Sequence, residues 1–251
     1  MHDDTIESAR YSEASASRPG DGLRRVTPEV LVIEVGRPGF TNFNYIVFDP
    51  SSRHAVIVDP AWEMDTLVAA LDQHGLNLLA VLVTHSHRDH LNLAEPFAER
   101  YGCPIWMSSQ EVAYAGFRSD RLRLIEASTW RIGTLEVQAL LTPGHTPGCV
   151  CFKIGENLFT GDVLFAEGCG LCMTNAGACE MFLSLEYLKR SLPGGTAIFP
   201  GHSYGKVPGQ RFASLLRDNM YLQFKDVDSF VAFRMRRGQV WMKAFEAAGR
   251  S

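Results

Sequence analysis

The stretch Thr84-His85-Ser86-His87-Arg88-Asp89-His90 decides the fold, because it places three imidazoles and a carboxylate directly after the apolar run 78–83. Polar groups at the end of a buried strand cost several kcal/mol unless something pairs with them. A divalent metal ion would do so, since zinc binds imidazole nitrogens and carboxylate oxygens and iron accepts them as well. The alternative is a solvated loop that happens to be rich in histidine.

Three further segments carry the same kinds of side chain next to glycine. They are Thr142-Pro143-Gly144-His145-Thr146-Pro147-Gly148, Gly161-Asp162 and Gly201-His202, and each follows a predicted strand. Glycine lets the backbone turn sharply and come close to a ligand sphere. Five of the eight histidines lie in these four loops. Their joint occurrence favours a dinuclear metal site over unrelated loop histidines.

The motifs T-H-S-H-R-D-H, T-P-G-H-T-P-G, T-G-D and P-G-H together resemble the metallo-β-lactamase superfamily, and within it the glyoxalase-II-like hydrolases. The resemblance extends from about Leu31 to His202, with a weaker continuation to Gly238. It implies an α+β fold, a four-layer αβ/βα sandwich with the metal site at one edge. The motifs are specific for the fold and the metal centre, and much less specific for the substrate.

The resemblance also implies a ligand set for two divalent ions, with zinc expected and iron or manganese as alternatives. The expected ligands are His85, His87 and His145 for the first ion, Asp89, His90 and His202 for the second, and Asp162 between them. Two cations about 3.5–4 Å apart stabilise a bridging hydroxide near neutral pH, and this hydroxide would attack a carbonyl. Asp89 is expected to orient the hydroxide and so to act in catalysis. Asp59 is expected to bond within its loop and not to ligate.

Length and composition are typical of one globular unit of 251 residues, with 46% hydrophobic and 21% charged residues. The net charge of −4 and the pI near 6.1 give no reason to expect nucleic acid as a partner. A run of 18 or more apolar residues is missing, so no membrane span is expected. The polar N-terminus is unlike a secretory signal, and a cytoplasmic enzyme is the expectation. The oligomeric state is left open.

The chain is expected to consist of a flexible tail (1–24), a core (25–203) and a C-terminal helical segment (204–251) packed on the core. Hydrophobic runs bounded by Gly, Pro and Ser predict strands at 30–35, 44–48, 55–58, 78–83, 105–108, 135–141, 150–154, 157–160 and 197–199. Helical spacing of apolar residues predicts helices at 65–74, 91–101, 110–118, 179–191, 211–221 and 230–247.

The segment Cys169-Gly170-Leu171-Cys172 is formally a C-x-x-C motif, which could form a redox pair or a structural zinc site. A second pair at zinc-finger spacing does not accompany it. Reduced thiols are the expectation in a chain without a secretory signal.

The residue after Gly170 bears on the substrate. In glyoxalase II a Gly-Cys-Gly is commonly followed by Arg or Lys, which binds a glutathione carboxylate, whereas this chain has Leu171. Leucine cannot pair with a carboxylate, which argues against glutathione thioesters and glutathione persulfide alike. The segment 161–182 and the motif P-G-H-S-Y-G resemble instead the zinc hydrolases of trans-acyltransferase polyketide clusters.

This second resemblance implies an acyl-S-acyl carrier protein, or another thioester, as the substrate. Phe165, Leu171 and Met173 are then expected to contact the acyl chain or the pantetheine arm, with plain loop packing as the alternative. Lys206 and Arg211 are candidates for the phosphate of the carrier, because Arg and Lys recognise phosphate well. Ordinary surface charge is the alternative for both.

Four functions therefore remain in view. The first is a metal-dependent thioesterase that releases acyl groups from a carrier protein. The others are a glutathione thioester hydrolase (glyoxalase II), a mononuclear iron persulfide dioxygenase and a binding protein without catalysis. The complete ligand set, including Asp89, His90 and His202, favours the first.

Overall fold

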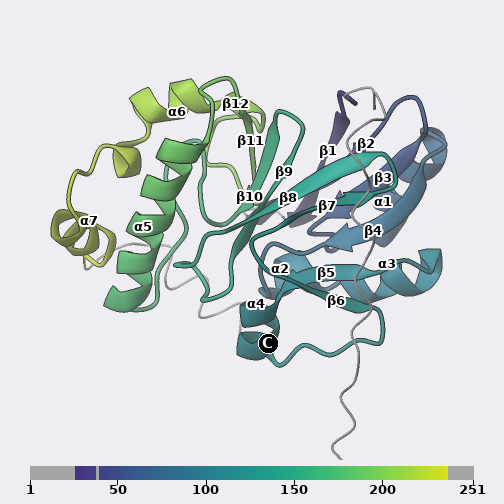
Figure 1. Cartoon of the computed structure of the whole chain (residues 1–251), viewed down its shortest axis with the longest axis horizontal. Helices are drawn as coiled ribbons and strands as arrows, with labels where there is room; N and C mark the ends of the chain where they lie inside the picture. Colours follow the sequence, from purple (N-terminus) through teal and green to yellow (C-terminus); the bar gives the residue numbers. More distant parts are fainter. Residues whose placement is uncertain (1–25, 38–39, 237–251) are drawn as a thin grey trace, which may run out of the picture.

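Two six-stranded sheets pack face to face in the computed structural model, which describes residues 26–37 and 40–236 (Figure 1). The strands of the first sheet, in spatial order, are β1 (Glu29–Arg37), β2 (Phe40–Phe48), β3 (His54–Val58), β4 (Asn77–Leu82), β5 (Ile105–Ser108) and β6 (Leu122–Ile125). Those of the second are β12 (Gln210–Arg211), β11 (Ala197–Pro200), β10 (Asn157–Gly161), β9 (Val150–Ile154), β8 (Leu135–Leu141) and β7 (Thr129–Ile132).

Helices cover the outer face of each sheet. They are α1 (Met64–Gln73), α2 (Arg88–Leu91), α3 (Ala94–Tyr101), α4 (Ser109–Ala115), α5 (Asn175–Ser191), α6 (Phe212–Asp218), the 3-10 turn η1 (Met220–Leu222) and α7 (Val227–Arg234). Helices α1 and α3 share a core cluster with the first sheet, and α5, α6 and α7 share one with the second, at the left of Figure 1. The predicted four-layer α+β sandwich is confirmed.

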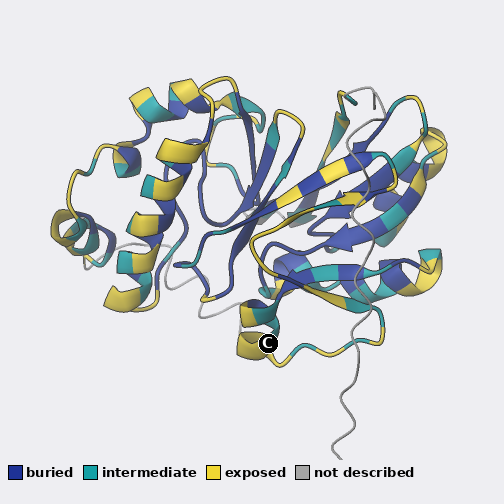
Figure 2. Cartoon of the chain, in the orientation of Figure 1, coloured by how far each residue is buried: buried dark blue, intermediate teal, exposed yellow. Residues whose placement is uncertain are grey.

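The inner faces of the sheets meet in an aromatic cluster. The ring of Tyr45 on β2 lies 5.3 Å from that of Phe159 and 5.4 Å from that of Phe199, and these two rings lie 5.2 Å apart. The Tyr45 hydroxyl donates a 2.5 Å hydrogen bond to the carbonyl oxygen of Pro200 on β11. Tyr45 thus joins the two sheets by both apolar and polar contacts, and Figure 2 shows the buried band between the sheets.

Strand β4 supplies the apolar run that precedes the histidine motif. It pairs in parallel with β3 on one side and with β5 on the other. Its residues from Ala80 to Leu82 are 0% exposed, because one face packs on β8–β11 and the other on α1 and α3. A central parallel strand that is covered on both faces reads as a continuous apolar run. The prediction for 78–83 differs from the structure by one residue at each end.

The helix predicted at 91–101 is wrong in its first part. The structure has the four-residue α2 and then α3, separated by Asn92 and Leu93. The Leu93 N–H donates to the carbonyl oxygen of Pro60 at 3.2 Å, and the Asn92 side-chain oxygen accepts from the Trp62 N–H at 3.3 Å. These bonds to the turn after β3 replace the bonds of a continuous helix, so helical spacing alone could not reveal the break.

Strands β6, β7 and β12 were not predicted. Strands β6 and β7 lie at sheet edges, and in each only the last residue, Ile125 or Ile132, is buried. Edge strands with charged side chains lack the alternation that signals a half-buried strand. Strand β12 has two residues, and the helix predicted at 211–221 ends at Asp218 before η1.

The described residues set limits on three expectations. The tail at 1–24 and the part of the 230–247 helix beyond residue 236 lie outside them, and within them the last helix begins earlier, at Val227. Among the described residues, no helix combines the length and apolarity needed to cross a membrane.

Replacing Tyr45 by Phe should lower the free energy of unfolding by about 1–3 kcal/mol, because the Pro200 carbonyl would lose its buried donor while the aromatic packing stays. Urea unfolding followed by circular dichroism measures this. Tyr114→Phe, at a side chain that is 58% exposed, is the matched control. Equal stability of the two variants would contradict a structural role for the Tyr45 hydroxyl.

Candidate metal centre

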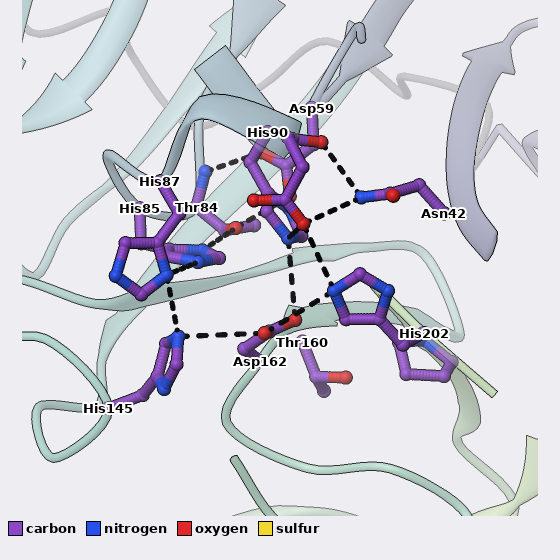
Figure 3. Close-up of polar contacts among 12 residues, drawn as sticks. Asn42, Asp59, Thr84, His85, His87, His90, His145, Thr160, Asp162 and His202 are labelled. Carbon is purple, nitrogen blue, oxygen red and sulfur yellow. Dashed lines mark hydrogen bonds and ion pairs between the residues drawn. The ribbon is translucent and has the colours of Figure 1, made fainter. Parts of the chain in front are cut away.

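The seven predicted ligand residues lie together at one edge of the sandwich, where four strands end (Figure 3). His85 and His87 follow β4, and Asp89 and His90 lie in α2, which begins directly after them. His145 lies in the loop between β8 and β9, Asp162 directly follows β10, and His202 follows β11. Both sheets therefore contribute to the site.

His85, His87 and His145, here called the first cluster, point ring nitrogens at one another. Nδ1 of His87 lies 3.1 Å from Nε2 of His85 and 2.9 Å from Nε2 of His145. A tetrahedral zinc ion with bonds of about 2.0–2.1 Å separates its ligand atoms by about 3.3 Å. The three nitrogens are therefore spaced as one face of such a coordination sphere requires.

Asp89, His90 and His202, here called the second cluster, lie beside the first. Oδ2 of Asp89 is 3.5 Å from Nε2 of His90 and 3.3 Å from Nε2 of His202. Asp162 stands between the clusters, with Oδ2 3.5 Å from Nε2 of both His145 and His202 and Oδ1 3.4 Å from Nε2 of His90. One carboxylate thus faces both groups of ligands.

The polar atoms of this site fit a metal ion better than they fit one another. Nε2 of His90 and Oδ1 of Asp162 are buried and make no hydrogen bond, although they lie 3.4 Å apart. Leaving a buried polar atom without a partner costs about 1–3 kcal/mol. A divalent ion would satisfy both atoms, so the His and Asp clusters suit a metal site.

Three of the histidines are oriented by bonds to their other ring nitrogen. Nδ1 of His145 lies 2.7 Å from the Leu171 carbonyl oxygen, and Nδ1 of His202 lies 2.8 Å from that of Thr41. Nδ1 of His90 lies 2.9 Å from Oδ2 of Asp59. Such partners fix the tautomer and turn Nε2 toward a metal.

Asp59 occupies a left-handed backbone conformation, with φ of 49°, at the end of β3. Its Oδ1 accepts from the Thr84 N–H at 2.7 Å, and its Oδ2 accepts from the Thr84 hydroxyl at 2.6 Å as well as contacting His90. The Asn44 amide holds the Asp59 carbonyl oxygen at 2.6 Å. This geometry favours the predicted structural role for Asp59 over ligation.

Asn42 is a site residue that the sequence analysis missed. Its amide nitrogen donates to the backbone oxygen of Asp89 at 2.9 Å and to Oδ2 of Asp89 at 3.0 Å. The indole N–H of Trp62 donates to the Asn42 side-chain oxygen at 3.2 Å. Asn42 is 1% exposed and lies on β2, with Asn44 two residues later on the same face of the strand. Two amide side chains on one face of a largely apolar strand were the feature of the sequence that could have indicated this role.

Two glycines permit the close approach of the loops. A Cβ on Gly201 would lie 2.4 Å from Cε1 of His90 and 2.6 Å from Oδ1 of Asp162. A Cβ on Gly170 would lie 1.8 Å from the Asp162 carbonyl oxygen. Neither position has room for a side chain, so Gly170 of the C-x-x-C motif serves the metal site through its size.

Of the five residues predicted to contact substrate, Leu171 and Phe165 touch histidines of the clusters, whereas Lys206 and Arg211 pair with other parts of the chain. Leu171 bonds to His145 through its carbonyl, while Met173 is 68% exposed. Phe165 is buried, with its ring against His202 and Tyr204. Nζ of Lys206 lies 3.7 Å from Oδ2 of Asp218, and Nη1 of Arg211 donates to the Gly195 carbonyl at 2.6 Å. Their contact with a substrate stays a prediction.

The two clusters differ in their protonation. Burial, together with neighbouring imidazoles, lowers the pKa of His85 well below its usual value and that of His87 to about 4. Burial also disfavours charge on His202, but the nearby carboxylates, Asp162 first, outweigh it and raise its pKa to about 10. The carboxylates of Asp89 and Asp162 likewise outweigh burial and raise the pKa of His90, whereas burial lowers the pKa of His145. At neutral pH the three histidines of the first cluster are therefore uncharged, whereas His90 and His202 carry protons that a metal ion would have to displace.

Metal loading of the two clusters should therefore respond differently to acid. Protons compete with a metal ion for His202 at every pH below about 10, but for His87 only at about pH 4 and below. After dialysis at about pH 5.5, the ion left in a His202→Ala variant should be retained, and the ion left in a His87→Ala variant should be lost. Metal content measured by elemental mass spectrometry decides this. Retention in the opposite order would contradict the assignment of charge.

Known proteins resemble this chain closely. The metallo-beta-lactamase superfamily profile matches residues 36–202. A probable polyketide biosynthesis zinc-dependent hydrolase from Bacillus velezensis is 41% identical over 215 residues, which are 85% of this chain and 96% of that protein. A probable hydroxyacylglutathione hydrolase from Schizosaccharomyces pombe is 35% identical over 184 residues, covering 69% of this chain and 68% of that protein.

Among solved structures, a metallo-beta-lactamase from Staphylococcus aureus superposes with a TM-score of 0.74 at 20% identity, over 84% of this chain and 67% of that one. This likeness concerns the fold. The resemblances inferred from the motifs, to the superfamily and to the polyketide hydrolases, are confirmed. The chain therefore belongs to the metallo-beta-lactamase superfamily.

Proposed function

We propose that this chain is a dinuclear metal-dependent thioester hydrolase that releases acyl groups from acyl carrier protein in polyketide biosynthesis. The chain is a metal-dependent hydrolase, as its family and its relatives indicate. The observation that carries the finer proposal is Leu171, a neutral residue beside the metal centre at the position where glyoxalase II commonly has Arg or Lys. The zinc-dependent polyketide hydrolase that matches 85% of the chain supports it.

Two ions are proposed because the donor residues form two separate groups. Each cluster offers three ligand atoms within 4.8 Å of one another, and Asp162 faces both. Seven donors exceed what one tetrahedral ion can use. Zinc suits these nitrogen and oxygen donors, and iron and manganese would accept them as well. When bound, the ions supply the Lewis acidity that makes water a nucleophile near neutral pH and stabilises the developing oxyanion.

The protein's own residues would hold and orient the reactants. The pKa of Asp89 is lowered, since nearby imidazoles outweigh its burial, so this carboxylate stays ionised and accepts hydrogen bonds. Asn42 fixes Oδ2 of Asp89 and the Leu171 carbonyl fixes His145. Asp89 therefore has the position and charge to orient an attacking water molecule. Its catalytic role remains a prediction.

The uncharged segment from Cys169 to Met173 beside the metal centre favours a carrier-bound thioester over a glutathione thioester. A phosphopantetheine arm has an uncharged stem, whereas glutathione brings two carboxylates that need cationic partners. The segment from Cys169 to Met173 has none, and the exposed Met173 adds apolar surface beside it. Lys206 and Arg211 lie beyond His202 and could meet the carrier phosphate, although each already has one partner within the chain.

The alternatives fit less well. Glyoxalase II activity has the support of the hydroxyacylglutathione hydrolase relative, but Leu171 removes the carboxylate partner. A mononuclear iron dioxygenase would need one cluster only, while both are complete here. Complete clusters equally disfavour a member without catalysis.

Replacing Asp162 by Ala should lower the bound metal below two ions per chain and abolish hydrolysis, because the residue between the clusters is lost. Elemental analysis and a thioesterase assay on the same sample measure both effects. Asp72→Ala, at an exposed position of α1, is the control and should retain metal and rate. Two ions and normal turnover in Asp162→Ala would show that the assignment is wrong.

The unmodified enzyme should hydrolyse acyl-S-carrier at least about tenfold faster, by kcat/KM, than S-lactoylglutathione, since a carboxylate without a charged partner forfeits about 1.5–3 kcal/mol. Leu171→Arg should raise kcat/KM for S-lactoylglutathione, whereas Leu171→Met should leave it low. Intact mass spectrometry of the carrier protein and absorbance of the glutathione ester follow the two reactions. A preference of the unmodified enzyme for S-lactoylglutathione would make this chain a glyoxalase II.

A further inference from the structure

Glu111 is a buried carboxylate close to the metal centre that is not among its ligands. It lies in the first turn of α4 and is 0% exposed. A buried charge is costly unless it is well hydrogen-bonded. Its carboxylate accepts four hydrogen bonds, all from neutral groups.

The four donors belong to two loops, and each carboxylate oxygen accepts both of its hydrogen bonds from one of these loops. Oε1 accepts from the backbone N–H of Ser86 at 2.8 Å and from its hydroxyl at 2.6 Å. Oε2 accepts from the Thr146 hydroxyl at 2.7 Å and from the Gly148 N–H at 2.9 Å. Ser86 lies between His85 and His87, and Thr146 follows His145. One carboxylate therefore joins the two loops that carry the whole first cluster.

At the start of α4, the bonds from the Glu111 carboxylate to the ligand loops replace a bond that a capping box would make within the helix. Ser108 caps the helix by accepting from the Glu111 N–H at 3.1 Å, which is half of a capping box. In the complete motif the glutamate would bond back to the N–H of the cap residue. Here the Glu111 carboxylate points to the ligand loops, while the Ser108 hydroxyl donates to the Gly148 carbonyl at 2.5 Å.

The loop of His145 lies tightly against this helix. A Cβ on Gly148 would lie 2.1 Å from the Glu111 nitrogen and 2.5 Å from its Cα, so no other residue fits there. The distance between the loop and α4 is therefore fixed by backbone contact as well as by the carboxylate.

The second cluster is held by different groups. Asn42 binds Asp89, Asp59 contacts His90, and the Thr41 carbonyl lies at His202. The described bonds of Glu111 all go to the first-cluster loops and to its own helix cap. Asp89 and His90 continue from the Ser86 loop but have these separate partners, so loss of Glu111 should affect the first cluster more than the second.

We propose that Glu111 is a positioning residue that sets the spacing of the first cluster and thereby the affinity of this cluster for its ion. The proposal rests on the proposed metal centre and adds a residue that tunes one half of it. Nδ1 of His87 lies 3.1 Å from Nε2 of His85 and 2.9 Å from Nε2 of His145. A ring nitrogen carries either one proton or one lone pair, so it can form a good hydrogen bond with only one of these two partners, and an ion is needed to satisfy all three nitrogens. The Glu111 carboxylate holds both loops close together before the ion binds, so the loops lose less conformational entropy on binding.

Glu111→Gln tests this with little change in shape. An amide has one oxygen, so its NH₂ group must face either the Ser86 N–H or the Gly148 N–H, and donor then meets donor. The affinity for Zn²⁺, measured by competition with a chromophoric chelator, should fall at least about tenfold for one of the two ions. Glu126→Gln is the matched control, because Glu126 accepts a hydrogen bond from Ser109 of the same helix and is exposed.

Two backgrounds identify the affected cluster. In a His202→Ala background the loss caused by Glu111→Gln should persist, because the remaining ion is held by the first cluster. In a His87→Ala background it should largely disappear. An equal loss in both backgrounds, or metal affinity like that of Glu126→Gln, would overturn the proposal.

A second variant covers the case in which Glu111→Gln does not fold, as judged by the thermal unfolding of the metal-free protein. Ser86→Ala removes one of the four donors and should weaken the same ion by a smaller factor, again only in the His202→Ala background. An unchanged affinity there would also overturn the proposal. If the unmodified chain binds fewer than two ions, the proposed dinuclear metal centre is wrong. If the unmodified chain and Glu111→Gln both bind two ions with the same affinities, only the proposed role of Glu111 is wrong.

Discussion

The convergence of buried imidazole nitrogens and carboxylate oxygens at one edge of the sandwich is the constraint on which the structure depends. These atoms satisfy one another only in part, since Nε2 of His90 and Oδ1 of Asp162 lie 3.4 Å apart without a hydrogen bond. A cation between them would turn the cost of their burial into a gain. The strands that end there, the glycines that keep Cβ atoms out of the site and the carbonyls that turn the rings all follow from the need to bring these atoms together.

The metal site also couples the two sheets. Asn42, Asp59 and the Thr41 carbonyl belong to the first sheet or its loops, while Asp162 and His202 follow strands of the second. The bond from Tyr45 to the Pro200 carbonyl reaches the strand that ends two residues before His202. An ion that binds the folded state and not the unfolded state stabilises the folded state by mass action. Binding of metal ions should therefore strengthen the packing of one sheet on the other.

Local features of the sequence were enough to predict much of this fold and site. The strand before Thr84 and the loops of His145, Asp162 and His202 are recognisable because ligand, glycine and apolar run are neighbours in sequence. The roles of Asn42 and Glu111 were not predicted, because their hydrogen-bond partners lie 47 and 25–37 positions away in the chain. The break after α2 was not predicted for the same reason, since its bonds go to the turn at Pro60. Long-range polar contacts leave no periodic trace in a sequence.

Leu171 shows how one position can separate the metal centre from the choice of substrate. Its carbonyl oxygen lies 2.7 Å from Nδ1 of His145, and every residue other than proline or glycine could offer this carbonyl with little change in the backbone. Its side chain is therefore free to vary while His145 stays oriented. Under the proposed function, the backbone at this position serves the metal centre and the side chain contacts the substrate, so a change of residue here would change which thioester finds a partner. Because the contact with His145 is made by the backbone, an arginine in place of Leu171 should leave the ligand clusters formed and alter the specificity.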